Sequence, residues 1–403
     1  MLPAGRDEEL NYIEQAFGDK YPPVSTVTFF RGDISAVQSS LPKKVASIVV
    51  ANKWLDGVMH RSGKKLMLRV PDRVVDANAR HYAEAPRQPA VGAELANDPV
   101  ALERLLSPYF VAKGVDAGPL FRVTLLPTRP GEFAVIMSLH HGVADGATYY
   151  AIYAMLGSVP AYSMDARRVP EFTLGSVQQM IGPKHAAWQV SPVMIMVWIA
   201  TMMCGCGAKH PTALHLVSDE WVEEQKRLHA ADADAVAKAP YVSTNDILTS
   251  FVARTVDTSY AMMNVDFRSK MAALTGKEAG CYFGRMLYAK DEVASPAGIR
   301  RSLNVMGAAR PESGVPSLLE TLDPNLIHVT NWASLNKTPL KLPGCTQTLH
   351  LPIMSPGPMP RGYSVCIIFQ ATEERLGVRV FTSAENCARL AQSPALKPMP
   401  LRA

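Results

Sequence analysis

Short apolar runs alternate with stretches of helical spacing along most of the chain. The clearest pair of strands lies at 121–126 and 133–137, because a turn with Arg129, Pro130 and Gly131 separates the two apolar runs. Apolar residues at helical spacing then follow Gly146. This order predicts a β-hairpin whose second strand leads into a helix.

Similar patterns predict further strands at 24–30, 65–70, 261–267, 327–330, 364–369 and 376–381, and helices at 34–50, 102–109, 220–228, 245–256 and 385–391. We expect Pro42 to interrupt the first of these helices. Ser243 or Thr244 is placed to cap the helix that begins at Asn245. The pattern alone therefore predicts a mixed α/β protein of two domains.

Residues 186–208 contain no charged side chain, and residues 193–200 are strongly apolar. A membrane span needs about 20 apolar residues, and the polar residues Gln189 and Ser191 together with Pro192 weaken this stretch as a span. Two interpretations remain. Either the stretch is a helix packed inside the protein, or residues 193–203 lie on a membrane surface.

Composition narrows the class of protein. The 403 residues are 48% hydrophobic, which suffices for large cores, and the net charge is only +5. Basic residues form no aromatic-basic repeat, which disfavours nucleic acid as a partner, whereas a phosphorylated cofactor suits a mildly basic surface. Among six cysteines only Cys204 and Cys206 are close together, and residues 1–9 form no apolar signal. We therefore expect reduced thiols and a cytoplasmic location.

The candidate chemistry lies between the second strand of the hairpin and the following helix. This junction contains His140, His141 and Asp145. Histidine is the usual general base near neutral pH, and a nearby carboxylate can tie down the turn or set the tautomer of the ring. A buried histidine pair with a helix-capping aspartate is an equally good interpretation of these residues alone. Other metal-ligating residues are scattered, which disfavours a metal site.

The run from His140 to Gly146 resembles the HHxxxDG motif of an acyltransferase superfamily. This superfamily includes chloramphenicol acetyltransferase, condensation domains of peptide synthetases, wax ester synthases and the plant BAHD acyltransferases. Four later segments resemble BAHD motifs in the same order and at similar spacing: 243–248 the STND-type segment, 265–268 the VDxR segment, 282–284 the YFGN segment and 329–332 the TSW segment. The chain is thus identified as a BAHD-like member of this superfamily.

Two departures mark the chain as a divergent relative. Arg285 replaces the asparagine of YFGN, and no DFGWG follows Trp332. The corresponding place holds the residues 341–345, Lys-Leu-Pro-Gly-Cys.

The resemblance implies an α/β fold with two domains of similar size, each a mixed β-sheet flanked by helices. The implied division is an N-terminal domain at 1–185, an apolar crossover at 186–213 and a C-terminal domain at 214–403. An active-site channel would lie between the domains. A membrane span through the crossover would separate the two halves of this site, so we expect a soluble or peripheral monomer.

The resemblance also assigns roles to residues. His141 would be the general base that takes a proton from a hydroxyl or amine acceptor as it attacks an acyl-CoA thioester. Asp145 would be structural, with Arg268 as its partner, and His140 would serve in packing. A plain surface position for Arg268 is an equally good interpretation of the sequence alone.

Ser243, Thr244 and Thr330 match segments that line the CoA side of the channel in the family. Acyl-CoA would be a co-substrate, with no permanently bound cofactor and no metal. Two alternatives stay open. The first is a condensation-type enzyme that takes its acyl group from a carrier protein, which the lack of an attached carrier domain disfavours. The second is a catalytically silent binding protein, which the intact His141 and Asp145 disfavour.

Overall fold

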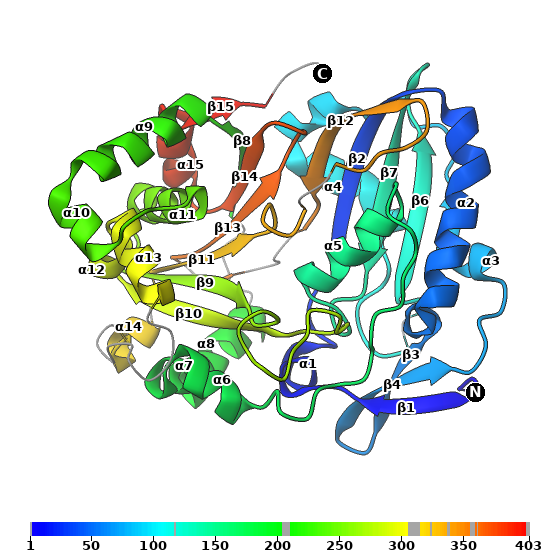
Figure 1. The fold of residues 1–403 in the computed structure, drawn as a ribbon, viewed down its shortest axis with the longest axis horizontal. Helices are drawn as coiled ribbons and strands as arrows, with labels where there is room; N and C mark the ends of the chain where they lie inside the picture. Colours follow the sequence, from blue (N-terminus) through cyan, green and yellow to red (C-terminus); the bar gives the residue numbers. More distant parts are fainter. Residues whose placement is uncertain are drawn as a thin grey trace.

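A computed structural model of the chain describes residues 2–116, 118–203, 210–304, 315–322, 325–336, 339–354, 359–360 and 362–399. It has the predicted α/β architecture, with two large mixed sheets side by side (Figure 1). The first sheet has the order β12-β2-β7-β6-β5, formed by Cys345–Pro352, Val24–Gly32, Glu132–Leu139, Phe121–Pro127 and Tyr82–Glu84. The predicted hairpin is confirmed, since β6 and β7 pair antiparallel with Phe121 opposite Leu139.

The second sheet has seven strands in the order β10-β9-β11-β13-β14-β8-β15. Their bounds are Phe283–Ala289, Tyr260–Asp266, Leu326–Asn331, Tyr363–Gln370, Leu376–Phe381, Thr212–Val217 and Leu396–Pro398. The strand β11 pairs parallel with both of its neighbours, β9 and β13, so its end lies at the same edge as theirs. A small third sheet joins β1 (Gly5–Glu9), β4 (Lys65–Pro71) and β3 (Val58–Ser62).

One strand crosses the predicted division of the chain. β12 comes from the C-terminal half, yet it pairs antiparallel with β2 in the first sheet, with Leu351 opposite Val27. The division at 1–185, 186–213 and 214–403 stays a prediction, and residues 345–352 of its C-terminal part lie in the first sheet. Sequence patterns did not predict that β12 joins the first sheet, because a strand's own residues do not specify which sheet edge it joins.

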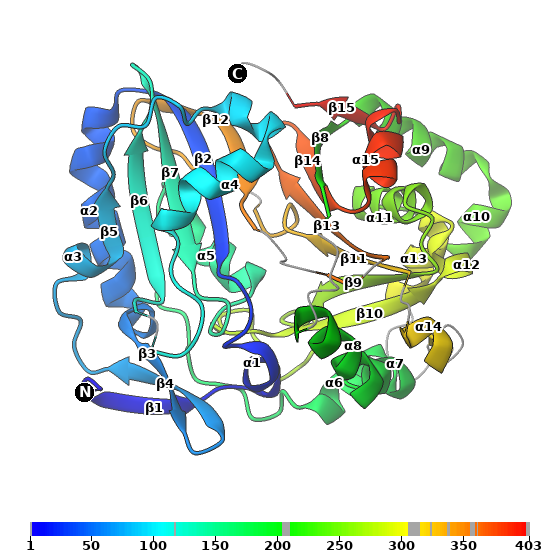
Figure 2. The same ribbon diagram turned by 180° about the vertical axis from the view of Figure 1, so that it is seen from behind.

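Helices cover the sheets on their outer faces (Figures 1 and 2). α5 lies across one face of the first sheet and α4 lies over the opposite face. The helices of the first half are α1 (Tyr12–Phe17), α2 (Ile34–Ala51), α3 (Ala77–His81), α4 (Pro99–Leu106), α5 (Gly146–Met155), α6 (Leu174–Ile181), α7 (Pro183–Gln189) and α8 (Pro192–Met203). Those of the second half are α9 (Asp219–Ala231), α10 (Ala233–Lys238), α11 (Thr244–Thr255), α12 (Lys290–Val293), α13 (Pro296–Asn304), α14 (Leu318–Leu322) and α15 (Ala384–Ala391).

The expected interruption at Pro42 is wrong, because α2 runs through it without a break. The helix buries five apolar side chains along one face: Val37, Leu41, Val45, Ile48 and Val49. Burial of a large aliphatic side chain stabilises by about 1.5–3 kcal/mol, so this face outweighs the loss of one backbone hydrogen bond at the proline.

Hydroxyl groups fasten α5 to the sheet beneath it. Tyr149 Oη donates to the carbonyl oxygen of Met137 at 2.9 Å and lies 2.8 Å from Thr26 Oγ1. Tyr150 Oη lies 3.0 Å from Nε2 of His350, a residue of the crossing strand β12. These buried contacts hold the start of α5, and with it the turn that precedes the helix, in a defined position on the sheet.

The apolar crossover forms two short helices, α7 and α8, before β8 begins at Thr212. Among the described residues, no helix is long and apolar enough to cross a membrane. Cys204 and Cys206 lie outside the described residues. The described cysteines Cys281, Cys345, Cys366 and Cys387 form no disulfide among themselves.

Candidate active site

His141 lies in the turn that joins the central strand β7 to α5. Its ring Nδ1 lies 2.9 Å from the carbonyl oxygen of Ala144, and the residue is partly exposed. The ring of Tyr21 lies beside it, with the centroids of the two rings 5.2 Å apart. A rigid strand on one side and a helix on the other therefore hold this imidazole.

The contact with Ala144 sets the tautomer of the His141 ring. A carbonyl oxygen can only accept a hydrogen bond, so Nδ1 carries the proton and Nε2 carries the lone pair. Burial lowers the pKa of His141, although the carbonyl groups around it and the charge of Asp145 act in the opposite direction. The ring is thus neutral at pH 7, and its Nε2 is available as a base.

His140 has both ring nitrogens engaged in the turn. Nε2 lies 3.1 Å from the carbonyl oxygen of Gly114, and Nδ1 accepts the N–H of Gly142 at 3.0 Å. Burial lowers the pKa of His140 to about 4, so the ring stays neutral. These contacts fit a packing role, because neither nitrogen is left for proton transfer.

Asp145 contacts Arg268. The guanidinium donates from Nη1 to Oδ2 at 2.8 Å and from Nη2 to Oδ1 at 3.1 Å, and both side chains are 6% exposed. Asp145 also caps α5 by accepting the N–H of Thr148, and it accepts the N–H of Tyr282. Burial by itself would raise the pKa of Asp145, but Arg268 and these N–H groups outweigh it and lower the pKa.

The structure therefore brings together two residues that lie far apart in the sequence. Arg268 follows β9 in the second sheet, whereas Asp145 follows β7 in the first. The carboxylate does not hydrogen-bond the His141 ring, so it acts on the imidazole through the position of the turn and through its charge. The capping interpretation and the ion-pair interpretation of Asp145 describe two contacts of the same side chain.

The loop at residues 278–282, from the second half of the chain, bonds to both sides of the Asp145–Arg268 contact. The carbonyl oxygen of Gly280 accepts from Arg268 Nη2 at 2.9 Å, from Thr148 Oγ1 at 3.0 Å and from the N–H of Asp145 at 3.2 Å. Gly280 has φ +145°, and a Cβ there would lie 2.9 Å from the ring of Tyr282. Only glycine fits this position without strain.

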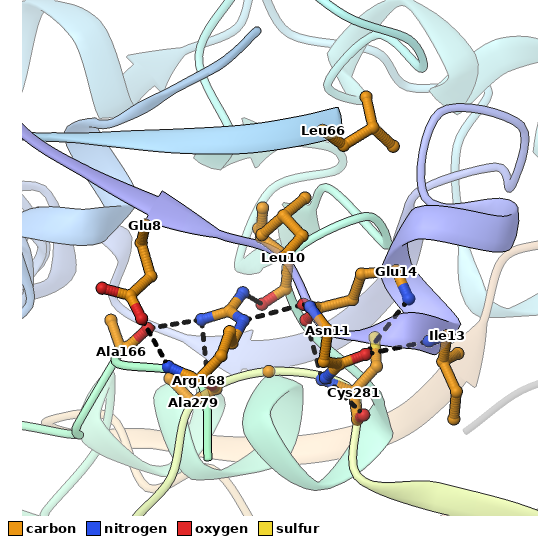
Figure 3. Close-up of polar contacts among 12 residues, drawn as sticks. Glu8, Leu10, Asn11, Ile13, Glu14, Leu66, Ala166, Arg168, Ala279 and Cys281 are labelled. Atoms are coloured by element: carbon orange, nitrogen blue, oxygen red, sulfur yellow. Dashed lines mark hydrogen bonds and ion pairs between the residues drawn. The ribbon is translucent and has the colours of Figure 1, made fainter. Parts of the chain in front are cut away.

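Besides the turn at 140–145 and the loop at 278–282, residues 11–21 also border the site, which sequence patterns did not predict. α1 begins with a capping box in which Asn11 and Glu14 bond each other's backbone N–H. Glu14 pairs with Arg168 at 2.7 Å, and both side chains are almost fully buried (Figure 3). The pair of a polar residue and a glutamate three positions later was a visible sign of the helix start, but nothing in the sequence links it to Arg168.

The residues predicted to line the CoA side lie where α11 and β11 meet. Ser243 caps α11, since its hydroxyl donates to Asp246 Oδ2 and accepts the N–H of Asp246. Thr244 and Thr330 are both partly exposed. The residues that follow each threonine are joined by a hydrogen bond of 2.9 Å, from Asn331 Nδ2 to Asn245 Oδ1. The two threonines therefore border the same region, whereas the Ser243 hydroxyl is occupied by the cap.

No protein-family model matches the chain, and no curated protein matches it in sequence. Solved structures do match it over nearly its whole length. TRI101 of F. graminearum, solved with coenzyme A and deoxynivalenol, is 14% identical, with a TM-score of 0.63 over 97% of this chain and 98% of TRI101.

Vinorine synthase is 12% identical, with a TM-score of 0.60 over 96% of this chain and 94% of the synthase. The first condensation domain of the calcium-dependent antibiotic synthetase is 13% identical, with a TM-score of 0.57 over 94% of this chain and 91% of that domain. At this identity the likeness shows a shared fold. The fold expected from the motif resemblance is thus confirmed.

Proposed function

We propose that the protein is a CoA-dependent acyltransferase that moves an acyl group from a thioester to a hydroxyl or amine acceptor. One observation carries this proposal. Nδ1 of His141 donates to Ala144, which leaves a neutral Nε2 that no described residue hydrogen-bonds. The likeness in fold to TRI101, which was solved with coenzyme A, supports acyl-CoA as the donor.

The reaction would proceed by proton transfer to Nε2 of His141. The acceptor oxygen or nitrogen forms a bond to the thioester carbonyl carbon as its proton moves to Nε2. The tetrahedral intermediate then collapses, the carbon–sulfur bond breaks, and the proton passes from the imidazolium to the leaving CoA thiolate. A lowered pKa makes the imidazolium a ready proton donor, which suits this second step.

Asp145 and Arg268 hold the turn rather than touch the reacting atoms. Thr244 and Thr330 are proposed to border the acyl-CoA, next to the start of α11 that Ser243 caps. The positive end of that helix would favour a phosphate group of the co-substrate.

A carrier-bound acyl donor is the alternative, favoured by the likeness in fold to a condensation domain. Both donors present the same thioester, so His141 would serve either one. The donor must therefore be tested directly.

The decisive experiment is a release assay for free thiol with purified protein, a panel of acyl-CoA thioesters and mixed alcohol and amine acceptors. We expect His141→Ala to lower turnover at least about a hundredfold while the protein stays folded. His229→Ala is the matched control, because that partly exposed ring on α9 bonds only the carbonyl oxygen of Ala239 among the described residues. Wild-type turnover in folded His141→Ala protein would overturn the proposal. Activity with acyl carrier protein but not with CoA would favour the alternative.

A further inference from the structure

The ion pair of Glu14 and Arg168 lies beside the backbone of Ala279 and Cys281 (Figure 3). Arg168 Nε donates to Glu14 Oε2 at 2.7 Å, and the two side chains are 5% and 0% exposed. Burying two charges is costly unless further hydrogen bonds satisfy them. Here Arg168 also donates from Nη1 to the carbonyl oxygens of Ala166 and Ala279, at 2.6 and 3.2 Å.

The start of α1 holds both backbone groups of Cys281. Its N–H donates to Glu14 Oε1 at 3.0 Å, and its carbonyl oxygen accepts from Asn11 Nδ2 at 2.9 Å. Cys281 stands between Gly280 and Tyr282, whose backbone groups contact Asp145. Two buried ion pairs therefore bond to the backbone of the same loop.

Arg168 and the loop residue Cys281 also contact the turn that contains His141. Arg168 Nη2 donates to the carbonyl oxygen of Val143 at 3.4 Å, and Cys281 Sγ lies 3.5 Å from the carbonyl oxygen of His141. The end of α1 also touches the turn, because a Cβ on Gly142 would clash with the carbonyl oxygen of Gly18. The backbone from 141 to 143 thus has contacts with Arg168, Cys281 and α1.

We propose that Glu14 and Arg168 are positioning residues that hold the turn at 141–144 in the form in which Ala144 accepts from His141 Nδ1. This inference rests on the proposed function, since it assigns a role toward the same base. Neither residue touches the reacting atoms. A shift of about 1 Å in a catalytic group costs up to about a hundredfold in rate, so a modest displacement of this turn has a large effect.

A purely structural role makes a different prediction. It would lower stability without changing the rate of each folded molecule, as expected for a buried ion pair elsewhere in the fold. Arg379 on β14 is 2% exposed and pairs at 3.4 Å with Glu103 on α4, which is 26% exposed, so Glu103→Gln removes the charge of a partly buried pair away from His141 and is the control.

The test measures kcat and KM well below the melting temperature of every variant. Glu14→Gln keeps the shape of the side chain and removes its charge, and Arg168→Lys keeps the charge and removes the forked donor. We expect each to lower kcat by about tenfold to a hundredfold with KM for acyl-CoA within about twofold. We expect Glu103→Gln to leave kcat unchanged. If Glu14→Gln does not fold, Arg168→Lys alone decides.

A second measurement repeats both substitutions in the His141→Ala background. A residue that acts only through His141 has no further effect once that ring is removed, so we expect the residual rate to stay the same. An unchanged kcat in both folded single variants, or an equal loss of rate with and without His141, would overturn the inference. If His141→Ala itself has the wild-type rate, the proposed function fails instead, which separates the two failures.

Discussion

Two buried ion pairs, Asp145 with Arg268 and Glu14 with Arg168, join the two halves of the chain at a place called the seam below, whereas α8 and α14 leave large apolar side chains in solvent. In the seam, Asp145 and Arg268 are each 6% exposed, and Arg168 and Glu14 are 5% and 0% exposed. On the two helices the exposed side chains are Ile195, Met196, Leu318, Leu319 and Leu322, from 46% to 78% exposed. Charged side chains are ordinarily exposed and large apolar side chains ordinarily buried, so both regions depart from this rule.

The two regions differ in whether their side chains have interaction partners within the protein. Every seam charge is paired and also hydrogen-bonded to backbone groups, which offsets the cost of burial. α8 packs beside α14. A hydrogen bond from Trp188 Nε1 on α7 to Thr321 Oγ1 also joins α14 to the helix that precedes α8. The outer faces of α8 and α14 nevertheless stay exposed. We therefore retain membrane-surface contact through 193–203 as a prediction, now extended to α14.

Breaking the seam should have the largest effect on stability. We expect Arg268→Ala to lower the free energy of unfolding by about 3–5 kcal/mol, because Asp145 is left buried without its partner. Asp145→Asn should also destabilise, and the double variant should lose less than the sum of the two. Urea unfolding of the four proteins measures this coupling. Lys290→Ala, which breaks an ion pair with both side chains 68% exposed, is the control and should unfold like the wild type. Additive losses would mean that the two side chains do not act as a pair.

A buried group without a charged partner should make stability depend on pH. His350 contacts the hydroxyls of Thr28, Tyr150 and Tyr153, and burial lowers its pKa to about 3. The unfolded chain takes up this proton near pH 6.5 and the folded chain only near pH 3, so stability falls as pH falls through this window. At pH 5 the loss from this residue is about 2 kcal/mol.

Urea unfolding at pH 7 and pH 5 checks this expectation. His350→Gln should reduce the difference between the two pH values, even though it also lowers stability at pH 7 through lost hydrogen bonds. An unchanged pH dependence in this variant would show that other groups are responsible.

Changing the exposed helices should have the smallest effect on stability. We expect the double variant Met196→Ser and Leu319→Ser to change the free energy of unfolding by less than about 0.5 kcal/mol per site. If these faces bind a membrane, the variant should partition about tenfold less onto vesicles of phosphatidylcholine with phosphatidylglycerol. Val75→Ser, at a residue 71% exposed on another part of the surface, is the matched control.

Sedimentation with vesicles measures this binding, and an alkaline carbonate wash should release the protein from them. A wild-type protein that stays in the supernatant at every lipid concentration would rule out the surface contact. Retention after the wash would instead rule out peripheral binding.

The elements around His141 were predictable because they depend on residues that are close together in the sequence. The strand that ends at Leu139, the helix that starts at Gly146 and the cap by Asp145 all depend on residues within a few positions of each other. The Asp145–Arg268 contact came from a motif resemblance, because no local pattern relates residues 123 positions apart. The pairing of Glu14 with Arg168 had no such guide and was missed.

By itself, the sequence determined the class of the fold, about half of the described strands and helices, and the placement of His141 at a strand end. These follow from apolar periodicity and capping, which act over one or two turns of chain. Only the tertiary structure decided that β12 joins the first sheet, that Pro42 lies inside a continuous helix, and that α1 forms a wall of the site. Each of these depends on the free energy of burial and pairing between distant segments, which is defined only once both segments are in place.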